Sequence, residues 1–216
     1  MNAINCLVFD LDGTLIDSSA GVVDAVNYSL RMMDRPEQPP DRIKRYIGFP
    51  LEQMYPDFTD APVDQLYHYF QKRAAETVVS STVPLDGVAE ALEVLNKQGF
   101  RMAIASTKIR RHVEGIVTKL GWSHLFEALV GGDDVAEVKP APDAFRVALE
   151  RLAAASDQTL VVGDTINDIQ AARAVPMRVI AVESPYRERS ELVAAQPDYL
   201  IESLRRLPSL LEQINR

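Results

Sequence analysis

The 216-residue sequence contains 47% hydrophobic and 25% charged residues, which is typical of a folded globular protein and excludes a largely disordered chain. This length allows one large domain or a core with a smaller insertion. A formal net charge of -8 repels nucleic acid and anionic membrane surfaces, so we expect no nucleic-acid or membrane partner.

The cysteine, histidine and hydropathy patterns exclude further classes. Cys6 is the only cysteine, so we expect no internal disulfide and no multi-cysteine metal site. His68, His112 and His124 are scattered and form no metalloprotease-like pair. The N-terminal apolar run ends at Asp10, too early for a signal peptide, and no apolar stretch approaches the roughly 20 residues that span a bilayer. We therefore expect a cytoplasmic protein.

The first predicted element is a buried strand over residues 4–9, which runs into the stretch DLDGT. Two carboxylates, Asp10 and Asp12, thus follow an apolar run directly. Ionised carboxylates beside an apolar interior are costly unless a cation or hydrogen bonds compensate them. An isolated DxD pair is usually just solvated, but strand ends are where ligands bind in α/β sheets. The pair is therefore a candidate site that needs compensating charge.

Residues 16–82 show helical periodicity and no convincing strand. One apolar stripe runs from Val22 to Met33 and another from Leu66 to Ala74, and the segments RPEQPP and IGFPLEQMYPDF lie between them. We interpret this region as a small helical domain inserted after the first strand, where it would lie over the strand ends.

After the insertion, short apolar runs alternate with helical segments. The runs cover residues 102–105, 128–130, 160–162 and 179–182. Alternating strands and helices predict a parallel sheet that helices cover on both faces. The expected fold class is therefore α/β, with a Rossmann-like parallel sheet core and an inserted small α-helical domain.

Polar residues follow several of these strands and should converge at one sheet edge. Ser106 and Thr107 follow the strand predicted over residues 102–105. Their hydroxyl and backbone N–H groups can hold phosphate oxygens there or simply cap the strand. Lys139 precedes a proline-rich turn; such a lysine is usually exposed, but directed at the acidic cluster it would neutralise carboxylates and phosphate. Asp164 and Asp168 lie four residues apart at a predicted strand-to-helix turn, so both can face one cation.

Carboxylate oxygens in this arrangement suit Mg²⁺, which binds carboxylates together with substrate phosphate. The alternative for Asp168 is a favourable interaction with the N-terminus of its own helix.

Taken together, DLDGT, Ser106, Lys139 and GDTIND resemble, in order, the four motifs of the haloacid dehalogenase-like (HAD) hydrolase superfamily. The helical insertion and the IGFPL loop are similar to the phosphoglycolate phosphatase-like branch with a helical cap of the C1 type. This resemblance implies a HAD-like α/β core over residues 1–15 and 83–216 and a helical cap over residues 16–82.

The resemblance also implies roles for the motif residues. Asp10 would be the nucleophile that forms an aspartyl-phosphate, and Asp12 the acid and base that serves the leaving group and then water. Ser106 and Lys139 would stabilise the transferring phosphoryl group, with Thr107 beside them. The implied ligands of Mg²⁺ are a carboxylate oxygen of Asp10, the backbone carbonyl of Asp12, and Asp164. Asp168 would be a further ligand or would contact the ligands without binding the ion itself.

Substrate choice is expected to lie in the insertion. By similarity, Gly48 and Phe49 would face the leaving group, and Arg45 with its basic neighbours would meet a second anionic group or form a solvated basic face. A small-molecule phosphorylated substrate is implied, with phosphoglycolate as the first candidate and pyrophosphate, sugar phosphates and nucleotide monophosphates as others. The expected assembly is a monomer or a homodimer.

Two other functions share parts of this pattern. A phosphomutase of the beta-phosphoglucomutase type has the same core and cap, but no cap residue identifies it here. A receiver domain of two-component signalling also uses strand-end aspartates, Mg²⁺ and a lysine, but its acidic pair is adjacent and it has no cap.

Overall fold

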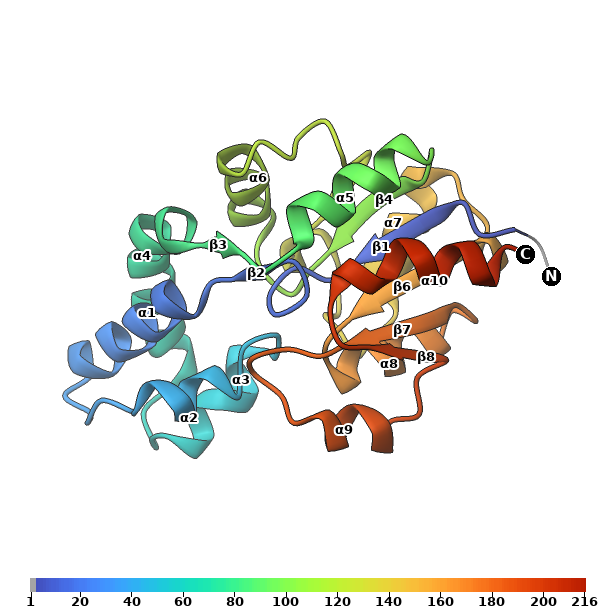
Figure 1. Ribbon diagram of the computed structural model, residues 1–216. Coiled ribbons are helices and arrows are strands. Elements are labelled where there is room, and N and C mark those ends of the chain that lie inside the picture. Colours follow the sequence, from blue (N-terminus) through green and yellow to red (C-terminus); the bar gives the residue numbers. More distant parts are fainter. Residues whose placement is uncertain (1–2) are drawn as a thin grey trace.

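The structure, a computed structural model, describes residues 3–216 and is organised around a six-stranded sheet (Figure 1). The strand order is β5-β4-β1-β6-β7-β8, and every neighbouring pair is parallel. The strands are β1 (Cys6–Phe9), β4 (Arg101–Ala105), β5 (Ala128–Val130), β6 (Thr159–Gly163), β7 (Arg178–Val182) and β8 (Tyr199–Ile201). This sheet confirms the predicted α/β class.

Helices cover both faces of the sheet because the central strand β1 is apolar in both directions. Leu7 and Phe9 point to one face, whereas Cys6 and Val8 point to the other. The first face packs on α5 (Val88–Lys97), α6 (Arg110–Lys119) and α10 (Leu207–Ile214). The second face packs on α7 (Asp143–Leu152), α8 (Ile166–Arg173) and α9 (Arg189–Ala194).

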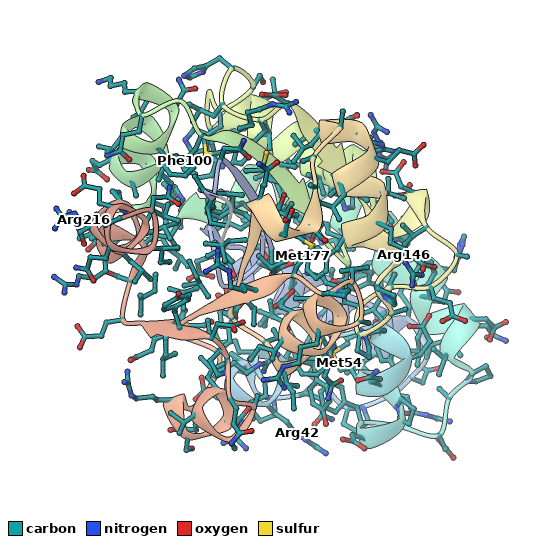
Figure 2. All side chains as sticks on the ribbon, turned by 90° about the vertical axis from the view of Figure 1, so that its right-hand side faces the viewer. Arg42, Met54, Phe100, Arg146, Met177 and Arg216 are labelled. Carbon is teal, nitrogen blue, oxygen red and sulfur yellow. The ribbon has the colours of Figure 1, made fainter. Side chains whose placement is uncertain are left out.

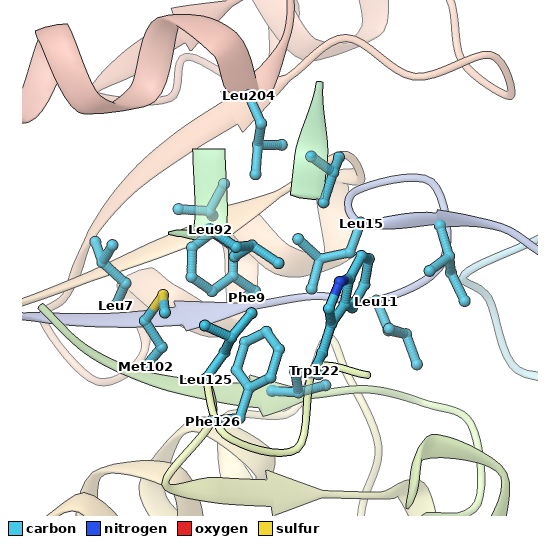
Figure 3. Packing of buried hydrophobic residues seen from close by; sticks show 14 of the residues in the cluster. Leu7, Phe9, Leu11, Leu15, Leu92, Met102, Trp122, Leu125, Phe126 and Leu204 are labelled. Carbon is cyan, nitrogen blue, oxygen red and sulfur yellow. The ribbon is translucent and has the colours of Figure 1, made fainter. Parts of the chain in front are cut away.

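The first apolar face contains most of the aromatic packing (Figure 3). The rings of Phe9 and Phe126 meet edge to face, with centroids 6.3 Å apart. Each fully buried Leu or Phe contributes roughly 1.5–3 kcal/mol to folding. This packing anchors β1, and therefore the residues that follow it. Figure 2 shows charged side chains at the periphery, where the exposed Arg42 and Arg216 lie at the outline of the molecule.

Four further helices lie at one side of the sheet (Figure 1). They are α1 (Ser19–Met32), α2 (Pro40–Lys44), α3 (Leu51–Met54) and α4 (Val63–Ser81). These helices have an apolar cluster of their own, which contains the fully buried Leu30, Ile43, Tyr55 and Leu66. α1 also pairs with α4 through Asp24 and Arg73, whose atoms are 2.6 Å apart.

Two short strands join this helical layer to the sheet. β2 (Ile16–Asp17) and β3 (Val83–Pro84) pair antiparallel, so the chain enters and leaves the layer at one point. The expectation of no strand within residues 16–82 was wrong at its first two residues, because a two-residue strand is too short to show periodicity. β8 was also missed, since its short apolar run resembles a loop.

The remaining elements are short 3₁₀ turns: η1 (Tyr55–Asp57), η2 (Gly132–Asp134), η3 (Ser156–Gln158) and η4 (Leu204–Arg206). Within residues 3–216, no helix is long and apolar enough to cross a membrane.

Candidate active site

Three neighbouring strands deliver polar residues to one edge of the sheet. Asp10 follows β1, Ser106 follows β4 and Asp164 follows β6. The Asp10 backbone N–H donates to Val162 O at 2.8 Å, and the Ser106 N–H donates to Val130 O at 3.0 Å, which extends the sheet pairing up to these residues. Because the strands are parallel, their carboxyl ends meet here, as in other α/β sites.

Lys139 is buried within this cluster, with 2% of its surface exposed. Its Nζ donates to Asp10 Oδ1 at 2.5 Å, to Asp168 Oδ1 at 2.7 Å and to Ala105 O at 3.0 Å. Burial alone would lower the pKa of Lys139, but the adjacent carboxylates of Asp10 and Asp168 raise it above its usual value. The lysine is therefore a fixed positive charge with all three N–H groups engaged.

The acidic residues carry more negative charge than Lys139 can balance. Burial raises the pKa of Asp10 well above its usual value, with Lys139 opposing the shift and Asp168 and Asp164 adding to it. Burial and the nearby Asp168 raise the pKa of Asp164 to about 7. Carboxylates crowded in this way protonate unless a cation joins them.

The geometry of the cluster is suited to such a cation. One oxygen each from Asp10, Asp164 and Asp168 lies within 4.8 Å of the others. Asp10 Oδ2 and Asp164 Oδ2 are buried and have no hydrogen-bond partner among residues 3–216. The three carboxylates provide the hard oxygen donors that Mg²⁺ prefers, and two of their oxygens are unpartnered.

Asp168 differs from the other two carboxylates because both of its oxygens are engaged. Oδ1 accepts from Lys139, and Oδ2 accepts from the backbone N–H of Thr165 at 3.0 Å and from its hydroxyl at 2.6 Å. The Thr165 hydroxyl in turn accepts from the Asp168 N–H, which completes a capping box at the start of α8. The predicted interaction with the N-terminus of its own helix is therefore confirmed, whereas a role of Asp168 toward a metal ion stays a prediction.

Two glycines let backbone approach the carboxylates. Gly13 has φ +87°, and a Cβ there would lie 2.3 Å from Asp164 Oδ2. At Gly163 a Cβ would lie 2.5 Å from Asp168 Cγ. A side chain at either position would displace a carboxylate, so the spacing of the acidic cluster depends on both glycines.

The side chain of Asp12 is not part of this acidic cluster and faces a different set of partners. Its Oδ1 accepts a hydrogen bond from the hydroxyl of Ser18, at the start of α1, and its Oδ2 is 3.3 Å from Lys108 Nζ. The Lys108 N–H also donates to Ser106 Oγ at 3.1 Å. Lys108 was not singled out from the sequence, although its position next to Ser106 and Thr107 is a usable signal.

A cavity of about 260 Å³ opens beside Asp12, between the sheet edge and the helices α3 and α4. Thr107, Gly48 and Phe49 line it, as does Lys108. Arg45, the fourth residue expected to contact substrate in this region, is exposed and does not belong to the lining. The geometry thus brings the predicted glycine and phenylalanine to the site but leaves the predicted arginine outside it.

Comparison with known proteins decides the family. The profile described as haloacid dehalogenase-like hydrolase matches residues 7–182. The chain belongs to the haloacid dehalogenase-like hydrolase family. The phosphoglycolate phosphatase of Pectobacterium atrosepticum is 32% identical to this chain over 210 residues, which cover 94% of this chain and 90% of the relative. Pyrophosphatase PpaX of Bacillus mycoides is 29% identical over 215 residues, which cover 98% and 99%.

A solved structure agrees with this assignment. A protein of Bacteroides fragilis, named as a haloacid dehalogenase-like hydrolase, superposes with a TM-score of 0.89 at 29% identity, over 94% of this chain and 99% of that one. The resemblance inferred from the four sequence motifs is therefore confirmed, and both the P. atrosepticum and B. mycoides relatives carry phosphatase names.

In this haloacid dehalogenase-like hydrolase, Arg187 links the sheet to the helical layer. From the loop after β7, its guanidinium donates to the carbonyls of Arg45 and Ile47, the latter at 2.6 Å, and lies 4.4 Å from the centre of the Phe49 ring. It thereby holds the Ile47–Gly48–Phe49 segment against the strand ends. No sequence signal identifies this contact, because its partners are backbone carbonyls 140 positions away.

His112, on α6, lines the same cavity and gives the hydrolase a predicted pH dependence. Burial, with Lys108 and Arg111 nearby, lowers the pKa of His112 from 6.5 to about 4, whereas Asp12 and Asp133 oppose the shift. Between these pH values the unfolded chain binds a proton at His112 that the folded chain does not. The free energy of unfolding therefore loses a contribution as pH falls through this window.

We expect His112→Gln to remove that contribution. The difference in unfolding free energy, wild type minus variant, should be smaller near pH 5 than near pH 7, as measured by urea denaturation at both values. Equal differences at the two pH values would contradict the assignment.

Proposed function

We propose that this hydrolase is a Mg²⁺-dependent phosphatase that cleaves a small-molecule phosphate monoester through an aspartyl-phosphate on Asp10. The observation that carries the proposal is the buried contact of Asp10 with Lys139 beside two unpartnered carboxylate oxygens. A nucleophile, a fixed ammonium group and a space for a metal ion thus lie together at the carboxyl ends of the strands. The phosphatase names of the relatives support the same reaction class.

In the first step, the Asp10 carboxylate attacks phosphorus. An Asp10 O–P bond forms while the bond from phosphorus to the leaving oxygen breaks, and Asp12 donates a proton to that oxygen. Ser18 and Lys108 hold the Asp12 carboxyl in position for this transfer. In the second step, Asp12 takes a proton from water, the water oxygen attacks phosphorus, and phosphate leaves with Asp10 restored.

Lys139 and Ser106 stabilise the charge on the transferring phosphoryl group in both steps. Asp10 and Asp164 would hold Mg²⁺ through their unpartnered oxygens, with the backbone carbonyl of Asp12 as a further ligand and Asp168 keeping Lys139 and Thr165 in place. When bound, the ion neutralises carboxylate and phosphate charge so that the two can approach each other.

We also propose the division into a core over residues 1–15 and 83–216 and a cap over residues 16–82. The separate apolar cluster of α1 to α4 and the single β2–β3 crossing support it. Arg187 then joins core to cap beside Gly48 and Phe49. A small phosphorylated metabolite as partner, a cytoplasmic location and a monomeric or homodimeric state complete the proposal.

A mutase or a receiver-like phospho-acceptor would use the same acidic edge. Multiple turnovers with release of inorganic phosphate distinguish a phosphatase from both. We therefore expect phosphate release from a panel of monoesters in the presence of Mg²⁺, with phosphoglycolate and pyrophosphate included because the relatives are named for them. Phosphate transfer to a second sugar hydroxyl, or a single turnover, would contradict the proposal.

Removing the metal provides a further test. A chelator should abolish turnover, and Mg²⁺ should raise the thermal unfolding temperature of the wild-type protein, since a ligand that binds only the folded state stabilises it. Asp164→Asn should lose this stabilisation because it replaces a carboxylate that has an unpartnered oxygen with a neutral amide, which binds Mg²⁺ more weakly. Asp86→Asn, at an exposed carboxylate paired with Arg205, should keep it. Chelator-insensitive activity would contradict the metal assignment.

A further inference from the structure

We propose that the substrate's leaving group is an uncharged alcohol with an apolar or aromatic body, rather than glycolate or a second phosphate. The inference rests on the proposed phosphatase function and concerns the cavity beside Asp12. A leaving group must occupy this space, because Asp12 protonates the leaving oxygen and the cavity begins at Asp12.

The wall that the helical layer presents to this space is mainly apolar, although Glu52 and Gln71 also belong to it. α1 contributes Val22, α3 contributes Leu51 and Met54, and α4 contributes Phe70 and Ala74. An apolar wall binds the carbon skeleton of a ligand by removing it from water and provides no compensation for a buried charge.

The charges in the lining repel an anionic leaving group. Within residues 3–216, the charged groups that line the cavity are the carboxylates Asp12, Glu52 and Asp133 and one ammonium, Lys108. Lys108 lies 3.3 Å from Asp12 and is already paired with it. A carboxylate or phosphate on the leaving group would therefore meet an excess of negative charge and a lysine that is already engaged.

The basic residues that precede the GFPL turn do not change this balance. Arg42 donates to Gln38 Oε1 and to Asp57 O, each at 2.6 Å, and lies 4.9 Å from the centre of the Phe58 ring. Arg45 lies outside the lining. Arg187, a basic residue of the sheet layer that contacts this turn, donates to the Arg45 and Ile47 carbonyls.

The size of the cavity agrees with a larger leaving group. Its volume of about 260 Å³ exceeds what glycolate needs, since a water molecule occupies roughly 30 Å³ of liquid. Phe49 and Phe70 lie in the lining and provide aromatic surface for a ring. An aromatic or branched aliphatic alcohol therefore matches both the volume and the chemistry of the wall.

The test compares kcat/KM for benzyl phosphate, propyl phosphate, phosphoglycolate and pyrophosphate with Mg²⁺ present. Benzyl phosphate, propyl phosphate and phosphoglycolate all release a primary alcohol, so their comparison isolates the body of the leaving group. We expect benzyl phosphate to exceed phosphoglycolate and pyrophosphate by at least ~10-fold, with propyl phosphate between them.

A charge variant tests the cavity directly. Leu51→Lys places an ammonium in the lining and should shift the ratio of kcat/KM values toward phosphoglycolate by ~10-fold or more. Val94→Lys, on α5 and 40% exposed outside the lining, adds the same charge elsewhere and should leave the ratio unchanged. Lys108→Met should lower kcat/KM for benzyl phosphate and phosphoglycolate alike, because Lys108 acts through Asp12.

The outcomes separate the inference from the function on which it rests. If phosphoglycolate or pyrophosphate equals or exceeds benzyl phosphate, or if Lys108→Met selectively loses phosphoglycolate, the cavity recognises an anion and the inference is wrong while the phosphatase function stands. If none of the four compounds releases phosphate with Mg²⁺, the proposed function itself fails.

Discussion

Replacing Asp10 with Asn should lower kcat by roughly 10⁴-fold or more, the range found when a nucleophile that forms a covalent intermediate is removed. An amide has nearly the same shape as a carboxylate but does not attack phosphorus. The side-chain oxygen of Asn can still accept the hydrogen bond that Lys139 Nζ donates, so we expect the fold to be retained. Steady-state phosphate release and thermal unfolding measure the two quantities separately.

Asp86→Asn is the matched control for this variant, since Asp86 is exposed and lies on the α5 side of the molecule. It makes the same chemical change without touching the acidic cluster and should keep wild-type kcat. Activity of the Asp10 variant within tenfold of wild type would remove Asp10 from the role of nucleophile.

Replacing Lys139 with Met should destabilise the metal-free protein by about 3–5 kcal/mol, the usual cost of leaving a buried charge without its partner. Lys139 Nζ is a positive charge in contact with both Asp10 Oδ1 and Asp168 Oδ1. The side chains of Asp10 and Asp168 are 4% and 0% exposed. Without the lysine, the carboxylates of Asp10 and Asp168 repel each other in a buried space that water does not screen. Urea denaturation in the presence of a chelator measures the effect.

The same variant should lower kcat/KM by roughly 10²–10³-fold, because a preorganised charge at the transferring phosphoryl group is lost. Lys72→Met, at an exposed position of α4, is the matched control and should change neither quantity. Adding Asp168→Asn to Lys139→Met should recover part of the lost stability, since it removes one of the facing carboxylates. A stability loss below about 1 kcal/mol in Lys139→Met would show that the lysine does not balance the cluster.

The residues at the carboxyl ends of the strands could be predicted from the sequence, because a parallel sheet places these strand ends side by side. Asp10, Ser106 and Asp164 each end an apolar run, and the topology alone brings such residues together. Lys139 was harder to place, since it lies in a loop rather than on a strand. The order of the motifs predicted only a neutralising role toward the acidic cluster, and the structure adds the contact with Asp10 at 2.5 Å.

The contacts that shape the cavity could not be predicted in this way. Arg187 recognises backbone carbonyls, and any sequence can provide a carbonyl, so no residue pattern identifies its partners. Arg45 illustrates the converse: its charge made it a candidate, but its side chain is exposed outside the cavity while its carbonyl makes the contact. Side-chain direction in a short turn depends on packing that periodicity does not describe.

The acidic cluster is the physical reason for the cation that we propose at this site even before substrate binds. Burial raises the pKa values of Asp10 and Asp164, so keeping both carboxyls ionised in the metal-free site costs free energy. Lys139 compensates only part of this burial. The remaining compensation is what we assign to Mg²⁺ at the unpartnered oxygens of the two residues.

The central claim is that Asp10 accepts the phosphoryl group, and trapping that group tests it most directly. The protein is mixed with Mg²⁺ and a monoester that it hydrolyses, quenched in acid within the first turnover and digested for mass spectrometry. We predict one phosphoryl group on the peptide that contains Asp10, and none in Asp10→Asn. Rapid phosphate release with no phosphorylated peptide, or with the phosphoryl group on another residue, would contradict the account.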